Sequence, residues 1–334
     1  MKLRRLLPLL VVASLTACSQ YVYHQDTLFA FDTFINIKIK GHYGYSGQRT
    51  FGQVYNLAQE IDLVANAYGE NKEVTNIFDI NGTNEKIEIS ENLYKLLSCT
   101  LKAQKEIKYF NPMIRLLSDL WKKHLERNEV PSQEDINAEL LKMKESSFTV
   151  ETTNDEKFFV QRIGEGQIDV GAIAKGFMLD ECLEYLTYYS MGDYLIDAGS
   201  SSILLGENSN NKNSKKAGEA GTYSVNIRAL NKSIRCKNSF VSTSGITEQN
   251  TTIDGVTYSH IINPESGSAA SLYDEVIVIS KAVYGNGYLG DVLSTSFMMS
   301  SLDEIKEAET KFEVKAIVIK DSSILYQNEG IEIN

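Results

Sequence analysis

The residues between Gln167 and Asp180 have the types and spacing that could bind an anion. An apolar segment interrupted by Asp169 leads through Gly171 into Lys175 and then into helical spacing. This pattern is typical of a strand, a tight turn and the start of a helix. Such a turn presents backbone N–H groups and the positive end of a helix dipole, and Lys175 adds a full charge. Asp169, at the strand end, could take a hydroxyl or a metal-bound water. An ordinary turn with solvated Asp and Lys side chains explains the same residues equally well.

Asp291 and Thr295 form a second candidate group. They stand one helical turn apart in the helical pattern of residues 289–299 and therefore share a face. Carboxylate and hydroxyl oxygens with no Cys or His nearby suit Mg²⁺, which keeps several waters and bridges to substrate phosphates. The spacing alone is weak support, because an exposed Asp and Thr at this spacing are common in helices.

His260 is a third candidate. It follows Ser259 at the end of an apolar, strand-like segment that closes at Asn263–Pro264. An imidazole there could act as a general acid or base, although a lone His on an apolar strand is more often a hydrogen-bonded structural residue. Together, an anion-receiving turn, an oxygen-only metal face and a single His describe cleavage of a phosphate ester or anhydride.

The N-terminus indicates an export signal. A basic start and a short apolar core precede Leu15–Cys18, which resembles the lipobox of bacterial lipoproteins. The apolar run is too short to span a bilayer. We therefore expect residues 1–17 to be removed and Cys18 to be acylated, followed by a tether at 18–27 and one domain at 28–334. A plain secretory signal with an incidental Cys18 is the alternative.

Composition narrows the classes of partner. The net charge of −11 becomes −14 once residues 1–17 take three positive charges away, and this makes a poor surface for nucleic acid. The mature chain is long enough to bury a substantial core. Cys99, Cys182 and Cys236 are odd in number, and the four His lack metal-binding spacing. We expect neither a disulfide framework nor a zinc site.

Hydrophobic periodicity places these residues on interspersed strands and helices. Residues 29–39 alternate like one strand, while 54–65 and 93–107 have helical spacing, the second with Ser90 as N-cap. Tyr68 lies on a polar turn, where a tyrosine is usually a surface packing residue. Residues 122–150 resemble a solvated helical excursion. With no even βαβ repeat, we expect an α+β fold with largely antiparallel sheets and packed helices.

Several motifs also stand in a particular order along the chain. In chain order they are Tyr68–Thr75, Phe110–Pro112 before Trp121, Ile168–Phe177, Ser242–Gly245, Ser259–Pro264 with Ser266 and Gly267, and Gly290–Thr295. We interpret Ser242–Gly245 as a hydroxyl-rich turn. Their order and rough spacing resemble those of the ApbE-type FAD:protein FMN transferases, over nearly all of the mature chain. Many members of that family are exported lipoproteins, which agrees with Cys18. The resemblance implies the ApbE-like, T-fold-related architecture.

The resemblance also implies an activity and a site. The activity is Mg²⁺-dependent transfer of FMN from FAD to a Thr or Ser hydroxyl of an exported flavoprotein, with release of AMP. The Mg²⁺ ligands would be the main-chain oxygen of Ala172 and the side chains of Asp291 and Thr295, with Ser294 beside them. The implied FAD contacts are Phe31, Tyr68, Tyr109, Phe110, Asn111, Asp169, Lys175 and Ile262. Of the catalytic candidates, His260 and Asp169, we expect His260 to transfer a proton to or from a reacting oxygen.

Two other functions use the same residues. An Mg²⁺-dependent FAD pyrophosphatase would have water as acceptor and give FMN and AMP, and a flavin-binding lipoprotein would do no chemistry. The chain also departs from the family pattern at five places. Phe31–Asp32–Thr33 replaces the common Met-Gly-Thr, and Asn76, Ser200, Asn263 and Gly290 stand where Arg, Gly, Asp and Ala are usual. The implied metal ligands are retained, so we expect metal and FAD binding.

Overall fold

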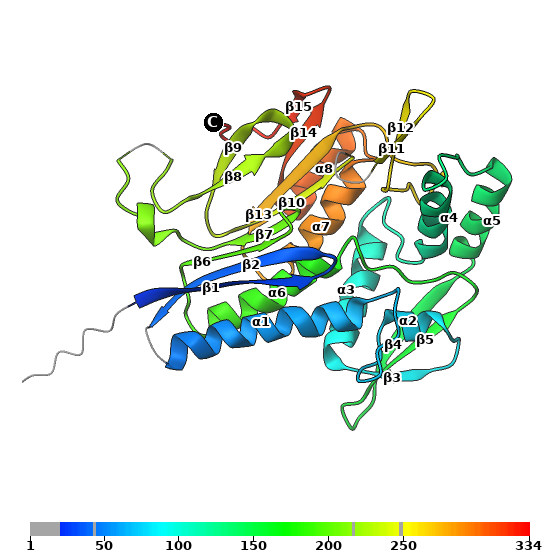
Figure 1. Ribbon diagram of the computed structural model, residues 1–334, viewed down its shortest axis with the longest axis horizontal. Helices are drawn as coiled ribbons and strands as arrows, with labels where there is room; N and C mark the ends of the chain where they lie inside the picture. Colours follow the sequence, from blue (N-terminus) through cyan, green and yellow to red (C-terminus); the bar gives the residue numbers. More distant parts are fainter. Residues whose placement is uncertain (1–20, 43–44, 216–217, 247–249) are drawn as a thin grey trace, which may run out of the picture.

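The computed structural model describes residues 21–42, 45–215, 218–246 and 250–334, so Cys18 and the export signal lie outside it. Its helices are α1 (Tyr45–Ala65), α2 (Ile77–Asn81), α3 (Glu91–Glu106), α4 (Arg115–Leu125), α5 (Gln133–Lys144), α6 (Ala174–Tyr188), α7 (Asn286–Phe297) and α8 (Leu302–Phe312), shown in Figure 1. None of the helices in these ranges combines the length and the apolar run needed to cross a bilayer.

An eight-stranded antiparallel sheet forms the centre of the molecule. Its strands, in spatial order, are β1 (Tyr21–Ala30), β2 (Thr33–His42), β6 (Tyr194–Ala198), β7 (Ser202–Leu205), β10 (Ser239–Gly245), β13 (Glu275–Lys281), β14 (Lys315–Lys320) and β15 (Ser323–Gln327). Three smaller sheets are also antiparallel. The first contains β3 (Ile87–Ile89), β5 (Phe158–Ile163) and β4 (Ser147–Thr152) in that order. The second pairs β8 (Tyr223–Ile227) with β9 (Lys232–Cys236), and the third pairs β11 (Asn250–Ile253) with β12 (Val256–Ser259). The predicted α+β class with antiparallel sheets and packed helices is confirmed.

The first two strands form a hairpin, which the alternating pattern at 29–39 did not predict. Phe31 and Asp32 have φ values of 52° and 55°, and Ala30 pairs with Thr33 across them. Two central residues with positive φ make the tight turn that joins twisted antiparallel strands. The buried positions change from even numbers (Leu28, Ala30) to odd numbers (Ile35, Ile37) across the turn, but Phe29, which is apolar and 63% exposed, makes the sequence look like one continuous alternation. β1 starts at Tyr21, so most of the segment expected as a tether pairs with β2.

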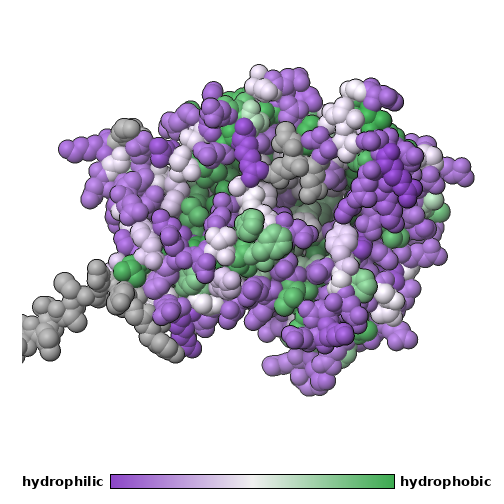
Figure 2. Space-filling model, viewed as in Figure 1, coloured by the Kyte–Doolittle hydropathy of each residue, from purple (hydrophilic) through white to green (hydrophobic). Residues whose placement is uncertain are grey.

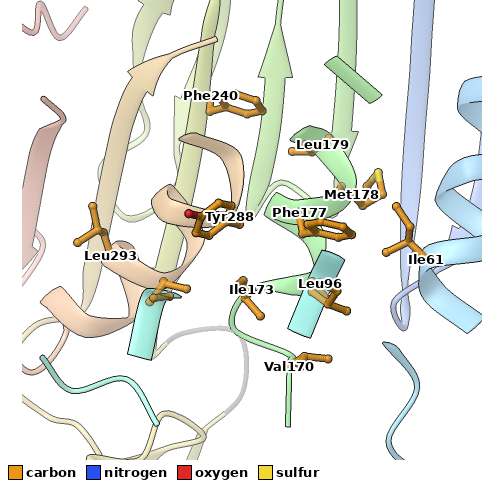
Figure 3. Packing of buried hydrophobic residues seen from close by; sticks show 14 of the residues in the cluster. Ile61, Leu96, Val170, Ile173, Phe177, Met178, Leu179, Phe240, Tyr288 and Leu293 are labelled. Carbon is orange, nitrogen blue, oxygen red and sulfur yellow. The ribbon is translucent and has the colours of Figure 1, made fainter. Parts of the chain in front are cut away.

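The two faces of the main sheet are covered differently. α1 and α6 lie along one face, and α7 packs against α6 and against β10 (Figure 1). Figure 3 shows Phe177 from α6, Tyr288 from α7 and Phe240 from β10 in this apolar layer. The opposite face is covered by the β8–β9 hairpin over a smaller cluster that includes Ile277 and Ile317. The large core therefore supports α6 and α7, which carry the candidate residues.

Residues 122–150 pack more closely than the predicted solvated excursion. Ile136, Leu140 and Met143 of α5 are buried. A Cβ at Gly267 would lie 2.4 Å from Cγ2 of Ile136, and the Trp121 indole donates a hydrogen bond to the Gly267 carbonyl oxygen. The expectation was wrong because the sequence shows the charged outer surface of α5 but not the loop that covers its inner face.

Candidate active site

A cavity of about 1050 Å³ opens beside the α4 region and the end of the main sheet. Figure 2 shows the molecular surface hollowed between the sheet and the part of the chain that includes α4 and α5. Ala172, His260 and Thr295 line this cavity. So do all eight residues predicted to contact FAD, which are Phe31, Tyr68, Tyr109, Phe110, Asn111, Asp169, Lys175 and Ile262. Segments distant in sequence therefore share one concave surface.

The turn at 170–173 leads into a helix as predicted, but the strand predicted before it was wrong: Gln167 forms only an isolated bridge with Ile114. The N–H groups of Ile168 and Asp169 donate to Asn81 and Pro112 instead of to a neighbouring strand. The N–H groups of Ile173 and Ala174 both donate to the Val170 carbonyl oxygen, and α6 begins at Ala174. Asp169 accepts a hydrogen bond of 2.7 Å from the Gly171 N–H. Burial raises the pKa of Asp169 above its usual value, while the Gly171 N–H lowers it. Asp169 thus lies on the cavity wall and stabilises the turn.

A carboxylate of the chain itself occupies part of the anion-binding end of α6. Asp291 Oδ2 accepts a hydrogen bond of 2.6 Å from the Gly176 N–H, and Ser202 and Ser242 donate to the same carboxylate. Asp291 is only 7% exposed, so the exposed Asp–Thr pair considered from the sequence is not what the structure contains. Burial raises the pKa of Asp291, whereas Lys175 and these hydrogen bonds lower it.

A chain of hydroxyl groups continues from Asp291 toward the cavity. Ser244 Oγ lies 2.8 Å from Ser294 Oγ and 3.1 Å from Thr295 Oγ1. Thr295 reaches the cavity wall, while Ser294 is buried and donates to the Asp291 carbonyl oxygen.

Three of these hydroxyl groups were not predicted from the sequence to belong to the site. Ser202 was not singled out, and Ser242 and Ser244 were assigned to a turn, although they lie in strand β10. The two-residue spacing of Ser242 and Ser244 places them on one face of a strand and could have indicated their common role. No comparable signal marks Ser202.

The donor atoms near Asp291 fit a hard cation. Within the described ranges, no three His, Cys, Asp or Glu side chains gather closely enough to hold a metal ion. A cation here would use the Asp291 carboxylate with hydroxyl, main-chain and water oxygens, and such a set suits Mg²⁺ better than a softer metal. Burial makes the negative charge of Asp291 costly, and a cation beside the carboxylate would offset that cost further than Lys175 does. The residues present therefore fit the implied ion.

Tyr68 presents an aromatic ring to the cavity. The guanidinium of Arg115 lies 4.3 Å from the ring centroid, and Arg115 Nε lies 3.4 Å from Asp119 Oδ2. Burial, followed by the charges of Asp169 and Asp119, raises the pKa of Tyr68 to about 12. The ring stays neutral at physiological pH, and it lines the cavity rather than packing only on the surface.

His260 also lies at the cavity. It follows the last residue of β12, and its side chain is exposed, whereas Ile261 and Ile262 after it are buried. Ser259 is buried and donates to the Ala270 carbonyl oxygen at 3.0 Å, which fixes the end of the strand. The imidazole is therefore at the cavity wall and outside the core, as a proton-transfer group requires.

The fold is shared with solved structures. The crystal structure of the ApbE protein from Thermotoga maritima matches with a TM-score of 0.71 and 22% identity, covering 93% of this chain and 97% of that chain. The flavin transferase ApbE from Vibrio cholerae matches with a TM-score of 0.68 and 19% identity, covering 94% and 97%. These likenesses define the class of fold as that of the ApbE structures.

Sequence comparison identifies the family. The model described as the ApbE family matches residues 31–318, and the chain belongs to this family. The FAD:protein FMN transferase of Treponema pallidum (strain Nichols) is 28% identical over 232 residues, covering 65% of this chain and 63% of the relative. That of Klebsiella pneumoniae (strain 342) is 29% identical over 215 residues, covering 63% and 65%. The matched stretch thus spans slightly less than two thirds of each of these relatives.

Proposed function

We propose that this chain transfers FMN from FAD to a Thr or Ser hydroxyl of an acceptor protein and releases AMP, with Mg²⁺ as cofactor. The observation that carries the proposal is the convergence of all eight predicted FAD contacts on one cavity, whose wall also includes Thr295, one helical turn from the buried Asp291. The volume of about 1050 Å³ is slightly above the range of about 300–1,000 Å³ for small-molecule cavities, which suits a dinucleotide. The names of the matched relatives support the same activity.

The chain's own residues would hold the diphosphate and the flavin. Lys175, in the first turn of α6, places a positive charge at the cavity wall for the phosphate oxygens. The Tyr68 ring, with Arg115 against it, offers a flat surface for a planar ring system. Mg²⁺, held by Asp291, Thr295 and the main-chain oxygen of Ala172, with Ser294 beside them, would offset negative charge on the diphosphate.

The transfer exchanges one phosphorus–oxygen bond for another. The acceptor hydroxyl oxygen bonds to the phosphorus of the FMN half, and the bond from that phosphorus to the AMP oxygen breaks, so AMP leaves with the electron pair. The hydroxyl proton must be removed as its oxygen attacks. His260 is the group that we assign to this proton, because it is an exposed imidazole on the cavity wall. Asp169 is the other catalytic candidate in the cavity.

One incubation separates this activity from the alternatives. The purified chain is mixed with FAD, Mg²⁺ and a flavoprotein that carries an acceptor hydroxyl, and the products are analysed by mass spectrometry. Covalent FMN on the acceptor together with AMP supports the transferase. Free FMN and AMP in the presence of the acceptor would indicate the pyrophosphatase, and unaltered bound FAD would indicate a binding protein.

We also propose that the mature protein is exported and held at the extracytoplasmic face of a membrane by a lipid on Cys18. Support comes from the basic start, the short apolar core and the Leu15–Cys18 motif. β1 begins at Tyr21, so the folded domain would follow the anchor closely. Labelling cells with a radioactive fatty acid tests this: the wild-type chain should take up label and Cys18→Ala should not. An equally labelled Cys18→Ala chain would contradict the anchor.

A further inference from the structure

Asp180 is a buried carboxylate to which the proposed reaction gives no role. It lies in the second turn of α6 and is 0% exposed. Its Oδ1 accepts hydrogen bonds from the N–H groups of Gly285 and Gly287 at 2.8 and 3.0 Å, and its Oδ2 accepts one from Tyr288 at 2.8 Å. Because the first N–H groups of a helix have no partner within the helix, Asp180 satisfies the N-terminal end of α7.

The same two helices are joined a second time in the opposite direction. Asp291 of α7 accepts its 2.6 Å hydrogen bond from Gly176, in the first turn of α6. Each helix thus supplies a carboxylate to the N-terminal end of the other, where the helix dipole favours negative charge. The position of α7 along α6 is fixed at both ends of the contact.

Between these two joints the helix backbones touch. A Cβ at Gly176 would lie 2.2 Å from the Gly287 carbonyl oxygen, and a Cβ at Gly287 would lie 2.4 Å from the Gly176 carbonyl oxygen. Any larger side chain at either position would push the helices apart. The contact therefore leaves α7 little freedom to shift unless the Asp180 hydrogen bonds change.

We propose that Asp180 is a positioning residue for the metal-binding face of α7. By fixing the start of α7 on α6, it sets where Asp291 and Thr295 stand relative to Ala172 and Lys175. The inference rests on the proposed function for its catalytic consequence, but its structural consequence, the affinity for Mg²⁺, is measured without turnover. Asp180 contacts no reacting atom in this scheme and acts only through the backbone of α7.

The test uses Asp180→Asn, which keeps the side-chain size but replaces one acceptor oxygen by an N–H₂ group facing backbone N–H groups. The melting temperature of the full mature chain is measured against Mg²⁺ concentration with no FAD present. We expect the Mg²⁺ concentration at half-maximal stabilisation to rise at least tenfold. In the flavin-transfer assay, kcat at low Mg²⁺ should fall by a similar factor and recover partly at high Mg²⁺, with KM for FAD changed less than threefold.

Two further variants keep the test decisive. Glu184→Gln removes an exposed carboxylate from the next turn of the same helix and should leave the Mg²⁺ midpoint unchanged. If Asp180→Asn does not fold, Gly287→Ala keeps both carboxylates but places a Cβ 2.9 Å from Cγ of Asp180, and it should weaken Mg²⁺ binding likewise. The proposal is overturned if Asp180→Asn folds and keeps the wild-type Mg²⁺ midpoint. If Asp180→Asn does not fold, it is overturned when Gly287→Ala keeps the wild-type Mg²⁺ midpoint.

The two readouts also separate this inference from the proposed function. A wild-type protein that responds to Mg²⁺ but labels no acceptor contradicts the transferase activity, while the Mg²⁺ midpoints still decide the role of Asp180. A wild-type protein without any response to Mg²⁺ contradicts the metal site and overturns this inference with it.

Discussion

At the scale of single residues, most departures from the family pattern have a local structural reason. Asn76 is completely buried, caps α2 together with Asp79 and donates to the Gly69 carbonyl oxygen. Asn263 accepts hydrogen bonds from the N–H groups of Glu265 and Ser266 and closes its own turn. These side chains support turns and helix ends and do not need to contact a ligand.

Arg115 gives the residue-scale prediction. Its planar guanidinium lies against the Tyr68 ring, and lysine keeps the charge but cannot stack in the same way. Stacking of this kind contributes about 0.5–2 kcal/mol, so Arg115→Lys should weaken FAD binding about 2- to 30-fold. Quenching of flavin fluorescence on titration measures it, and the Mg²⁺ midpoint serves as the internal control. Unchanged FAD affinity would show that the ring needs no support from Arg115.

At the scale of elements, the sequence predicted the local units but not their partners. The turn at 170–173 and the helix after it follow from apolar spacing, Gly171 and the small residues around it. The hairpin turn at Phe31 and Asp32 was hidden because the exposed Phe29 is apolar and extends the alternation of β2 in the sequence, although the buried positions change from even to odd numbers across the turn. The carboxylates that cap α6 and α7 come from more than 100 residues away, at separations of 115 and 105–108 positions. Such pairings depend on the tertiary arrangement, so no local spacing could reveal them.

The contact between α7 and β10 gives the element-scale prediction. A Cβ at Gly290 would lie 2.8 Å from Ser242 Oγ, which donates to Asp291 at 2.7 Å. Gly290→Ala should therefore displace this hydroxyl and cost about 1–3 kcal/mol of stability through overpacking. It should also weaken Mg²⁺ binding several-fold. Ser242→Ala removes the hydroxyl directly, so adding Gly290→Ala to it should cause little further loss of Mg²⁺ affinity.

Calorimetric titration of the two single variants and the double variant checks this coupling. If the two effects on Mg²⁺ affinity simply add, Gly290 does not act through Ser242. In that case Gly290 would have another role at the crossing of α7 and β10.

At the scale of the whole molecule, the fold buries several acidic side chains that lie far apart in the sequence. Burial raises the pKa values of six carboxyl groups, which are those of Asp62, Asp169, Asp180, Asp197, Glu275 and Asp291. The pKa of Asp180 rises to about 7. The resemblance led to the residues that line the cavity, because all eight of the FAD contacts that it implies lie there. It did not predict this charge environment, because the burial of a carboxylate depends on packing from several elements at once.

These pKa values predict how stability depends on pH. Above about pH 4 the unfolded chain has released protons that the folded chain still holds, so stability should be higher on the acid side and fall as pH rises toward 7. For Asp180 alone the shift from 3.8 to about 7 corresponds to at most about 4 kcal/mol. The metal-free protein should melt several degrees higher at pH 5.5 than at pH 8, and Asp180→Asn should reduce that difference.

The window from pH 5.5 to pH 8 isolates the raised groups, because Asp155, Asp193 and Glu304 have lowered pKa values and their contributions change only below about pH 4.5. A metal-free protein that becomes more stable from pH 5.5 to pH 8 would contradict the raised pKa values. The buried acids would then be ionised at little cost.

The central claim is that residues around 172, 260 and 291–295 form one metal-dependent site for splitting a flavin dinucleotide and passing on its FMN half. The most direct measurement is a mass spectrum of the acceptor protein after incubation with FAD, Mg²⁺ and either the wild-type chain or Asp291→Ala, with a parallel wild-type sample in EDTA. The account predicts one covalent FMN per acceptor site with wild type, and none with Asp291→Ala or in EDTA. Undiminished labelling in either of the last two samples would contradict it.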